Sequence, residues 1–86
     1  MKIVLYKNFE KQYSKLRSNE KKLFKKRKDI FFIDPYDPVL NNHPLRGKYK
    51  GYRSINVGGD LRAIYRLIND NIAFFVAIDT HSNLYS

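Results

Sequence analysis

The sequence predicts an α+β domain in which an N-terminal strand and two antiparallel helices pack on one face of a mainly antiparallel four-stranded sheet. Two observations support this fold class. Between Phe9 and Phe31 the apolar residues recur at helical spacing, whereas the second half consists of apolar runs of strand length separated by short turns. A chain of 86 residues has room for one core, so residues 1–86 are predicted to form a single domain.

The first two elements are a strand and a helix. Lys2–Tyr6 is a short apolar run with β-branched residues, which predicts a strand. Asn8 is of a type that caps helices, and we expect it to cap the first helix. Phe9, Tyr13 and Leu16 then fall at i, i+4 and i+7, so one face of this helix is apolar.

A second helix follows, with Ser18 or Asn19 as its cap. Most of its lysines point away from one face, which its apolar residues share. These apolar residues are Leu23, Phe24, Ile30 and Phe31. The run Ile30–Ile33 alone could also be a buried strand. We prefer the last turns of the helix, because nothing before Asp34 and Pro35 stops a helix.

The second half is predicted to be a loop and a three-stranded meander. Asp34–Pro44 holds three prolines, which exclude regular helix or sheet there. The expected strands are Tyr49–Val57, Leu61–Ile68 and Ile72–Ile78, joined by turns at Gly58–Asp60 and Asn69–Asn71. The last strand is apolar throughout, as is typical of a central strand. We expect the helices to cover one sheet face and the other face to stay open as a concave ligand surface.

Charge limits the classes of partner. Seventeen Lys and Arg against eight Asp and Glu give a net charge of +9, and eleven of the seventeen lie within residues 1–28. Such a field favours polyanions, namely nucleic acid, an anionic membrane or an acidic protein. The alternative is an ordinary solvated surface, although such a surface normally mixes both signs more evenly.

The sequence also argues against several classes of site. Cysteine is absent and the two histidines are far apart, so we expect no disulfide, no metal and no cofactor. The N-terminus lacks the apolar region of a signal peptide, and no stretch approaches the ~18 apolar residues of a membrane span. We therefore expect a cytoplasmic protein without a membrane partner. A membrane-surface role fits the basic helices poorly, because lysines surround them and tryptophan is absent.

Cations gather on the predicted sheet. Period-two spacing places Arg62 and Arg66 on one face. A second set alternates through the entry to the first meander strand, also on one face: Arg46, Lys48 and Lys50. His81 follows the last strand, at the rim of the sheet. Cations with a histidine at the rim indicate a phosphate site. They could equally keep an exposed face soluble and discourage edge pairing.

Three motifs show a resemblance to a known family. They are H-P-L-R-G-K-Y-K-G-Y-R (His43–Arg53), G-D-L-R-A-I-Y-R (Gly59–Arg66) and T-H-S-N-L-Y (Thr80–Tyr85). Together they resemble the RelE/ParE superfamily of bacterial toxins, and most of all its YafQ-type branch, from about Phe9 to the end of the chain. The resemblance implies a RelE-like microbial RNase fold and a toxin of a type II toxin–antitoxin system. Such a toxin is a metal-independent endoribonuclease that cuts mRNA on the ribosome.

The resemblance also implies roles for particular residues. His81 matches the general acid of the family, a role that suits histidine as a residue type because imidazole exchanges protons near neutral pH. His43 and Asp60 match positions linked to acid–base chemistry, so either could be the base, and Arg62 matches the arginine that stabilises the phosphate. The expected RNA-binding residues are Tyr85, which would stack on a base, and the cations Arg53, Arg46 and Lys48.

Two positions depart from the YafQ pattern. Asn56 stands where that branch has a further histidine, and asparagine does not transfer protons near neutral pH. Arg62 is basic where the branch tends to be apolar. A decayed RNA-binding module is therefore one alternative, and a ParE-like toxin that inhibits DNA gyrase without catalysis is another. The cognate antitoxin is expected to be acidic where it lies on this surface, and to cover the basic face or displace a helix.

Overall fold

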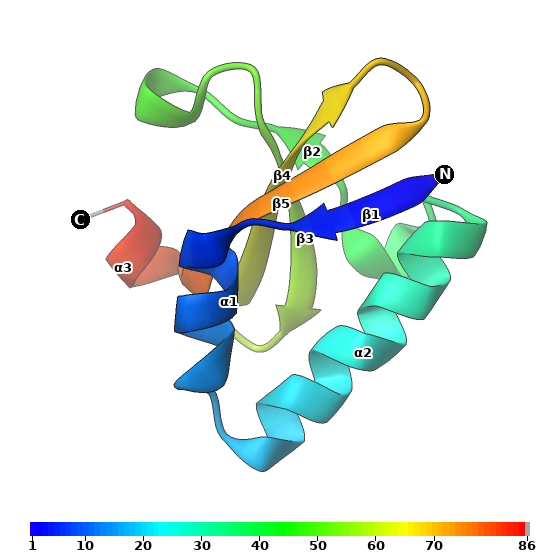
Figure 1. Cartoon of the computed structure of the whole chain (residues 1–86). Coiled ribbons are helices and arrows are strands. Elements are labelled where there is room, and N and C mark those ends of the chain that lie inside the picture. Colours follow the sequence, from blue (N-terminus) through cyan, green and yellow to red (C-terminus); the bar gives the residue numbers. More distant parts are fainter. Residues whose placement is uncertain (86) are drawn as a thin grey trace.

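The computed structural model describes residues 1–85, in which two longer helices pack against a five-stranded sheet and a short third helix follows the last strand (Figure 1). The helices are α1 (Lys7–Ser14), α2 (Ser18–Ile33) and α3 (His81–Leu84), with short 3-10 turns η1 (Pro38–Leu40) and η2 (Gly47–Tyr49). The strands are β1 (Lys2–Leu5), β2 (His43–Pro44), β3 (Arg53–Gly58), β4 (Leu61–Ile68) and β5 (Ile72–Thr80). The predicted fold class is confirmed, with one strand more than expected.

The sheet has the order β1-β5-β4-β3-β2. β5 pairs with β1 in parallel on one side and with β4 antiparallel on the other, which explains its continuous apolar sequence. A β-bulge interrupts the β4–β5 pairing, because Ile64 pairs with Ala77 whereas Tyr65 pairs with Phe75. Val76 is therefore the extra residue of the bulge.

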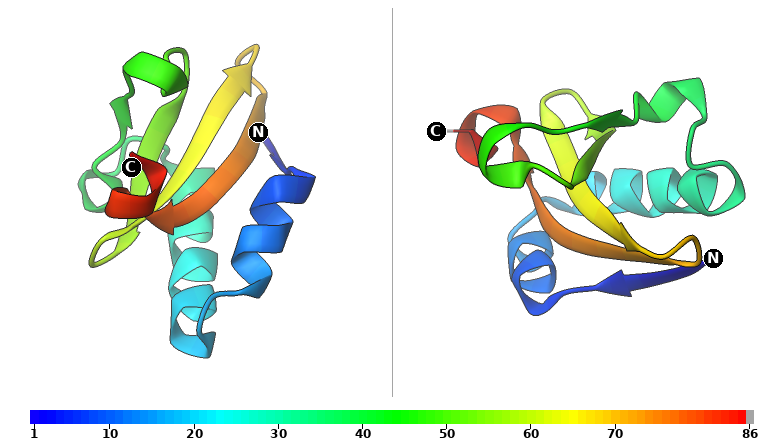
Figure 2. Two further views of the ribbon diagram at one scale, coloured as in Figure 1. Left: turned by 90° about the vertical axis from the view of Figure 1, so that its left-hand side faces the viewer. Right: turned by 90° about the horizontal axis from the view of Figure 1, so that it is seen from above.

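Helices α1 and α2 cover one face of the sheet and bury an aromatic core against it (Figures 1 and 2). Phe9 of α1 and Phe31 of α2 are fully buried and lie edge-on to Phe75 of β5, with ring centroids 5.9 and 5.4 Å away. Edge-on pairs of this kind add about 0.5–1.5 kcal/mol to the effect of burial alone. The apolar faces predicted for both helices are thus the faces that form the core.

Both helix starts differ slightly from the prediction. α1 begins at Lys7 after Tyr6, and Asn8 does not cap it; the Asn8 side chain instead donates from Nδ2 to the Val76 carbonyl, 2.9 Å away. α2 begins at Ser18, with Arg17 at the cap position, whose backbone N–H donates to the Glu20 carboxylate at 2.9 Å. The continuation of α2 through Ile33 is confirmed.

The segment before the meander differs more. The predicted loop contains β2, which adds the fifth strand by pairing His43 with Ser54. β3 begins at Arg53 rather than Tyr49, because residues 47–49 form η2 and Gly51 has a φ of 92°, which a strand residue cannot adopt. Lys48 and Lys50 therefore do not alternate along a strand.

The second sheet face is only partly open, contrary to the expectation. The loop of residues 45–52 and helix α3 lie at the same side of the molecule and bury a small second core (Figure 1). Its buried members are Leu45, Ile64, Ala77 and Leu84. Within residues 1–85, no helix is both long and apolar enough to cross a membrane.

Candidate functional site

Helix α3 fixes the position of His81 beside the β3–β4 turn. The Thr80 hydroxyl caps this helix by accepting from the Asn83 backbone N–H at 3.2 Å, and buried Leu84 anchors it to the second core. The backbone N–H of His81 donates to the Asp60 carbonyl at 2.9 Å. Two predicted site residues that lie twenty-one positions apart in sequence are therefore adjacent in the fold, and both are exposed.

Aromatic rings line this end of the sheet. His81 and Tyr85 are one helical turn apart, and their ring centroids are 4.8 Å apart. Tyr85 in turn lies edge-on to Tyr49, at 6.0 Å. Burial raises the pKa of Tyr85 above its ordinary value, while the nearby Arg62 acts in the opposite direction. The Tyr85 ring is therefore neutral at physiological pH and lies within electrostatic reach of the Arg62 guanidinium.

Arg62 occupies the middle of a cross-strand row. It pairs with Asn56 of β3 on one side and with Asp79 of β5 on the other. Its guanidinium folds toward the turn, where Nη1 donates to the Gly59 carbonyl at 3.0 Å. The structure thus brings Arg62, Asp60, His81 and Tyr85 together at one end of the sheet, and we call these four residues the α3 cluster.

His43 lies on the same sheet but farther across it. Its register with Ser54 places β3 and β4 between His43 and the strand that leads to His81. Its Nδ1 lies 2.8 Å from the Asn41 carbonyl, and this contact requires a proton on Nδ1. In the neutral ring, Nε2 is then the nitrogen that can accept a proton.

Arg53 lies on the opposite face from Arg62, because it pairs with Tyr65, which belongs to the aromatic core under the helices. Its Nε donates to Asn42 Oδ1 at 2.7 Å, and its guanidinium lies 5.4 Å from the centroid of the Tyr36 ring. Asn42 in turn donates to the Tyr65 hydroxyl at 2.7 Å. These contacts fasten the proline-rich loop to the sheet and do not bring Arg53 to the α3 cluster.

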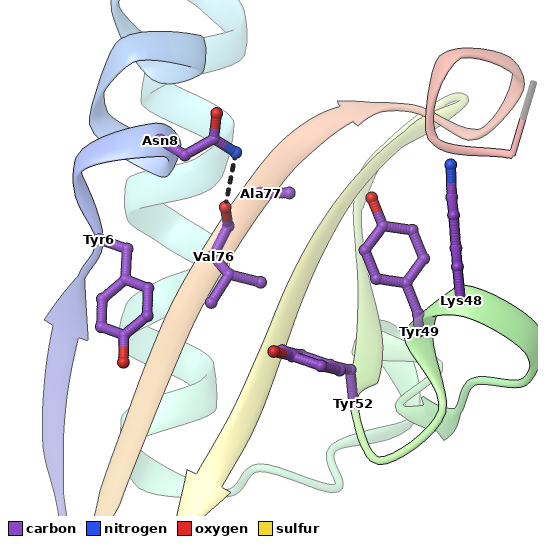
Figure 3. A pocket seen from close by; sticks show the side chains of 7 residues that line it. All are labelled: Tyr6, Asn8, Lys48, Tyr49, Tyr52, Val76 and Ala77. Atoms are coloured by element: carbon purple, nitrogen blue, oxygen red, sulfur yellow. Dashed lines mark hydrogen bonds between the residues drawn. The ribbon is translucent and has the colours of Figure 1, made fainter.

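The other two predicted RNA-binding cations lie in the loop of residues 45–52. Lys48 lies over the Tyr49 ring, with Nζ 5.3 Å from the ring centroid, and both side chains extend toward α3 (Figure 3). Arg46 is exposed at the start of η2. The loop thus adds positive charge and an aromatic ring beside the α3 cluster.

Sequence reasoning missed two residues of this region. Tyr49 was not among the expected site residues, although the K-Y-K-G-Y sequence around it mixes cations and aromatics as RNA-binding segments do. Asn56 was identified only as a departure from the family pattern. Its Oδ1 is buried without a hydrogen-bond partner among residues 1–85, on the sheet face that also carries Arg62.

The α3 cluster offers the groups that RNA cleavage requires. Its four residues carry an imidazole, a carboxylate, a guanidinium and a neutral phenol at one end of the sheet. No group of three or more potential metal-ligating side chains occurs within the described residues 1–85.

Similar solved structures show the class of protein to which this fold belongs. The structure is similar to the crystal structure of YafQ from E. coli strain BL21(DE3), with a TM-score of 0.82 and 25% identity, covering 98% of this chain and 97% of that one. It also shares its fold with the YoeB/ParE toxin from Agrobacterium tumefaciens, with a TM-score of 0.76 and 17% identity over 94% of this chain and 99% of that one. The chain therefore has the fold of the RelE/ParE superfamily of toxins.

The sequence comparisons define the family within that class. The model of the family "Bacterial toxin of type II toxin-antitoxin system, YafQ" matches residues 1–86, so this chain belongs to the YafQ toxin family. The curated mRNA interferase toxin YafQ of Escherichia coli K12 is 39% identical over 51 residues. That alignment spans 59% of this chain and about half (54%) of the relative. A further similar structure is the crystal structure of the E. coli DinJ-YafQ toxin-antitoxin complex. The matching chain of that complex is 26% identical to this chain, with a TM-score of 0.70, and the match covers 98% of this chain and 96% of that one.

Proposed function

We propose that this protein inhibits translation by cutting mRNA as a ribosome-dependent, metal-independent endoribonuclease. The observation that supports it best is the α3 cluster, in which the backbone of His81 is hydrogen-bonded to that of Asp60 and the Arg62 side chain folds to the same turn. The name of the E. coli relative, an mRNA interferase, supports the same activity.

In the proposed reaction the ribose 2′-hydroxyl attacks its own 3′-phosphate. A base removes the hydroxyl proton, the P–O5′ bond breaks, and an acid protonates the leaving 5′-oxygen. His81 serves as that acid, because imidazolium donates readily near neutral pH. Arg62 stabilises the additional negative charge on the phosphate in the transition state, and Tyr85 stacks on a base of the message.

The base is Asp60 or His43, and their positions distinguish them. Asp60 lies in the same cluster as His81, whereas two strands separate His43 from β5. Asp60 is therefore the first choice for a phosphate held between acid and base. His43 has its Nδ1 on the Asn41 carbonyl, so its Nε2 would act as the base on a nucleotide that lies across the sheet.

The expected partners are the ribosome with its mRNA and a cognate antitoxin, and the expected place of action is the cytoplasm. The complex of E. coli YafQ with DinJ supports an antitoxin partner for this chain. With a net charge of +9, this protein favours an antitoxin segment that is acidic where it lies on the basic surface.

The experiment that tests this function compares translation arrest and the 5′ ends of cellular messages after induction of the wild type and His81→Ala. We expect cuts in translated messages with the wild type and a loss of cleavage of about 10²- to 10⁴-fold with His81→Ala. Ser82→Ala is the matched control, because Ser82 is the exposed neighbour of His81 on the same helix. Arrest with intact messages would disprove the nuclease, and DNA breaks that depend on gyrase would then indicate the non-enzymatic alternative.

A further inference from the structure

Next to the α3 cluster, the second sheet face contains a hollow of about 360 Å³ (Figure 3). Tyr6 and Tyr52 form two of its sides, Val76 and Ala77 form its floor, and Lys48 and Tyr49 lie at the end that faces α3. We call it the tyrosine hollow. Its volume falls at the lower end of small-ligand sites, which span about 300–1,000 Å³.

The apolar floor results from the β-bulge in β5. Successive strand residues normally point to opposite faces, but the bulge lets Val76 and Ala77 both contribute to this side of the sheet. Asn8 at the margin of the hollow holds the bulge by donating to the Val76 carbonyl at 2.9 Å. The floor is therefore a fixed feature of the backbone.

The sides are aromatic and accessible. Tyr6 is 44% exposed and rests on Phe74, with ring centroids 5.1 Å apart. Tyr52 is half-buried, and the Arg66 guanidinium lies 5.8 Å from its ring centroid. The lining of the hollow thus combines three tyrosine rings with one cation, Lys48 over Tyr49, and contains no acidic residue; Arg66 adds a second positive charge behind Tyr52.

The tyrosine hollow is continuous with the α3 cluster. From Tyr85 the line of rings continues to Tyr49 at 6.0 Å and from Tyr49 to Tyr52 at 6.1 Å. An RNA strand whose phosphate is held at His81 would therefore follow these rings and bring a base a few nucleotides farther along into the hollow.

We infer that the tyrosine hollow binds an unpaired base of single-stranded RNA, a few nucleotides away from the phosphate that is cut. The base lies between Tyr6 and Tyr52 over the apolar floor, and Lys48 contacts its phosphate. Because every base has a stacking face, the subsite accepts any of the four with modest preference. The inference rests on the proposed function for its ligand, but it makes a separate claim about where that ligand binds.

The test is a titration of isotope-labelled protein with a single-stranded 2′-O-methyl RNA tetranucleotide, followed by amide NMR. This RNA is not cut, since the attacking hydroxyl is blocked. We expect shifts at Val76 and Ala77 together with shifts in α3. Tyr6→Ala and Tyr52→Leu should weaken binding by roughly 5- to 100-fold, the effect of losing one stacked base.

Tyr36→Ala is the matched control, because it removes an exposed tyrosine that packs against Arg53 outside the hollow. Thermal unfolding shows whether each variant is folded. Substitution of Tyr6 should disturb the fold less than substitution of Tyr52, because Tyr6 is more exposed. Three results would each overturn the inference. They are binding without a shift of the Val76 and Ala77 amide signals, an unchanged affinity of both hollow variants, and no binding of the tetranucleotide. Weakened binding of the antitoxin alone would also overturn it and assign the hollow to that protein.

Message mapping separates this inference from the proposed function. If the wild type makes cuts that are lost in His81→Ala, but the hollow variants bind RNA like the wild type, the proposed function is supported and the hollow is not a subsite. If the hollow binds RNA but no cut depends on His81, the subsite stands and the proposed chemistry fails.

Discussion

Arg53 and Arg62 lie on opposite sheet faces. We therefore predict that substitution of Arg53 lowers stability and leaves cleavage unchanged, whereas substitution of Arg62 lowers cleavage and leaves most of the stability. Arg53→Ala removes the bond from Nε to Asn42 Oδ1 at 2.7 Å and the contact with the Tyr36 ring. A hydrogen bond from a charged group contributes about 1.5–3 kcal/mol and an exposed cation–π contact about 0.5–1 kcal/mol. We therefore expect Arg53→Ala to lower the free energy of unfolding by about 2–4 kcal/mol.

Urea unfolding at 25 °C measures this loss directly, and in a chain of this size it corresponds to a melting temperature about 10–25 °C lower. Cleavage is then assayed on translating ribosomes at a temperature where the variant is folded. Under those conditions we expect Arg53→Ala to cut like the wild type. Arg62→Gln should show the reverse pattern. The bond of Arg62 to the Gly59 carbonyl is longer, at 3.0 Å, and exposed, so we expect a loss of only about 1 kcal/mol of stability but roughly 10²- to 10³-fold in cleavage.

One result would refute this reasoning. If Arg53→Ala unfolds like the wild type but no longer cuts mRNA, Arg53 acts on RNA as the family resemblance implies, and its hydrogen bond to Asn42 is unimportant. Arg53→Lys adds a control, because lysine keeps the charge but cannot reproduce the directed guanidinium bond.

Three further predictions concern the cap of α3, the buried phenol of Tyr65, and Asn56, which stands where the family has a histidine. Thr80→Ala should remove the cap of α3, cost about 1 kcal/mol and lower the hydrogen-exchange protection of the Asn83 amide. Burial raises the pKa of Tyr65, so the folded state holds this proton more tightly; stability should fall as pH rises above about 10, and Tyr65→Phe should reduce that fall in alkaline urea titrations. Asn56→His should raise cleavage and add an inflection at about pH 6.5 to the pH–rate profile, whereas an unchanged profile would mean that position 56 takes no part in proton transfer.

Much of the fold could be predicted because its main signals are local. The faces of Phe9 and Phe24 follow from helical spacing, and the β3–β4 turn follows from Gly59, whose φ of 51° is left-handed. The two-residue strand β2 could not be predicted, because its pairing with β3 depends on where the preceding loop is fastened by Asn42. A strand of that length has no periodicity of its own.

The candidate site was predictable in part. Period two predicts that Arg62 and Arg66 share one face, and the same rule places Arg53 with Ile55 on the face that the helices cover. Family resemblance outweighed that rule in assigning Arg53 to RNA binding. The contact of Tyr49 with Tyr85 had no sequence signal, since it requires the path of the loop through η2.

The parallel pairing of β1 with β5 has a consequence for the order of folding. Lys2 pairs with Ile72, so this contact closes a loop that contains most of the chain. In contrast, β3, β4 and β5 are joined by short turns. Contacts between distant residues carry the larger loop-closure cost, so we expect the meander to form first and β1 to add late. Val4→Ala should then speed unfolding and leave the refolding rate nearly unchanged in stopped-flow experiments, while Ile64→Val should slow refolding.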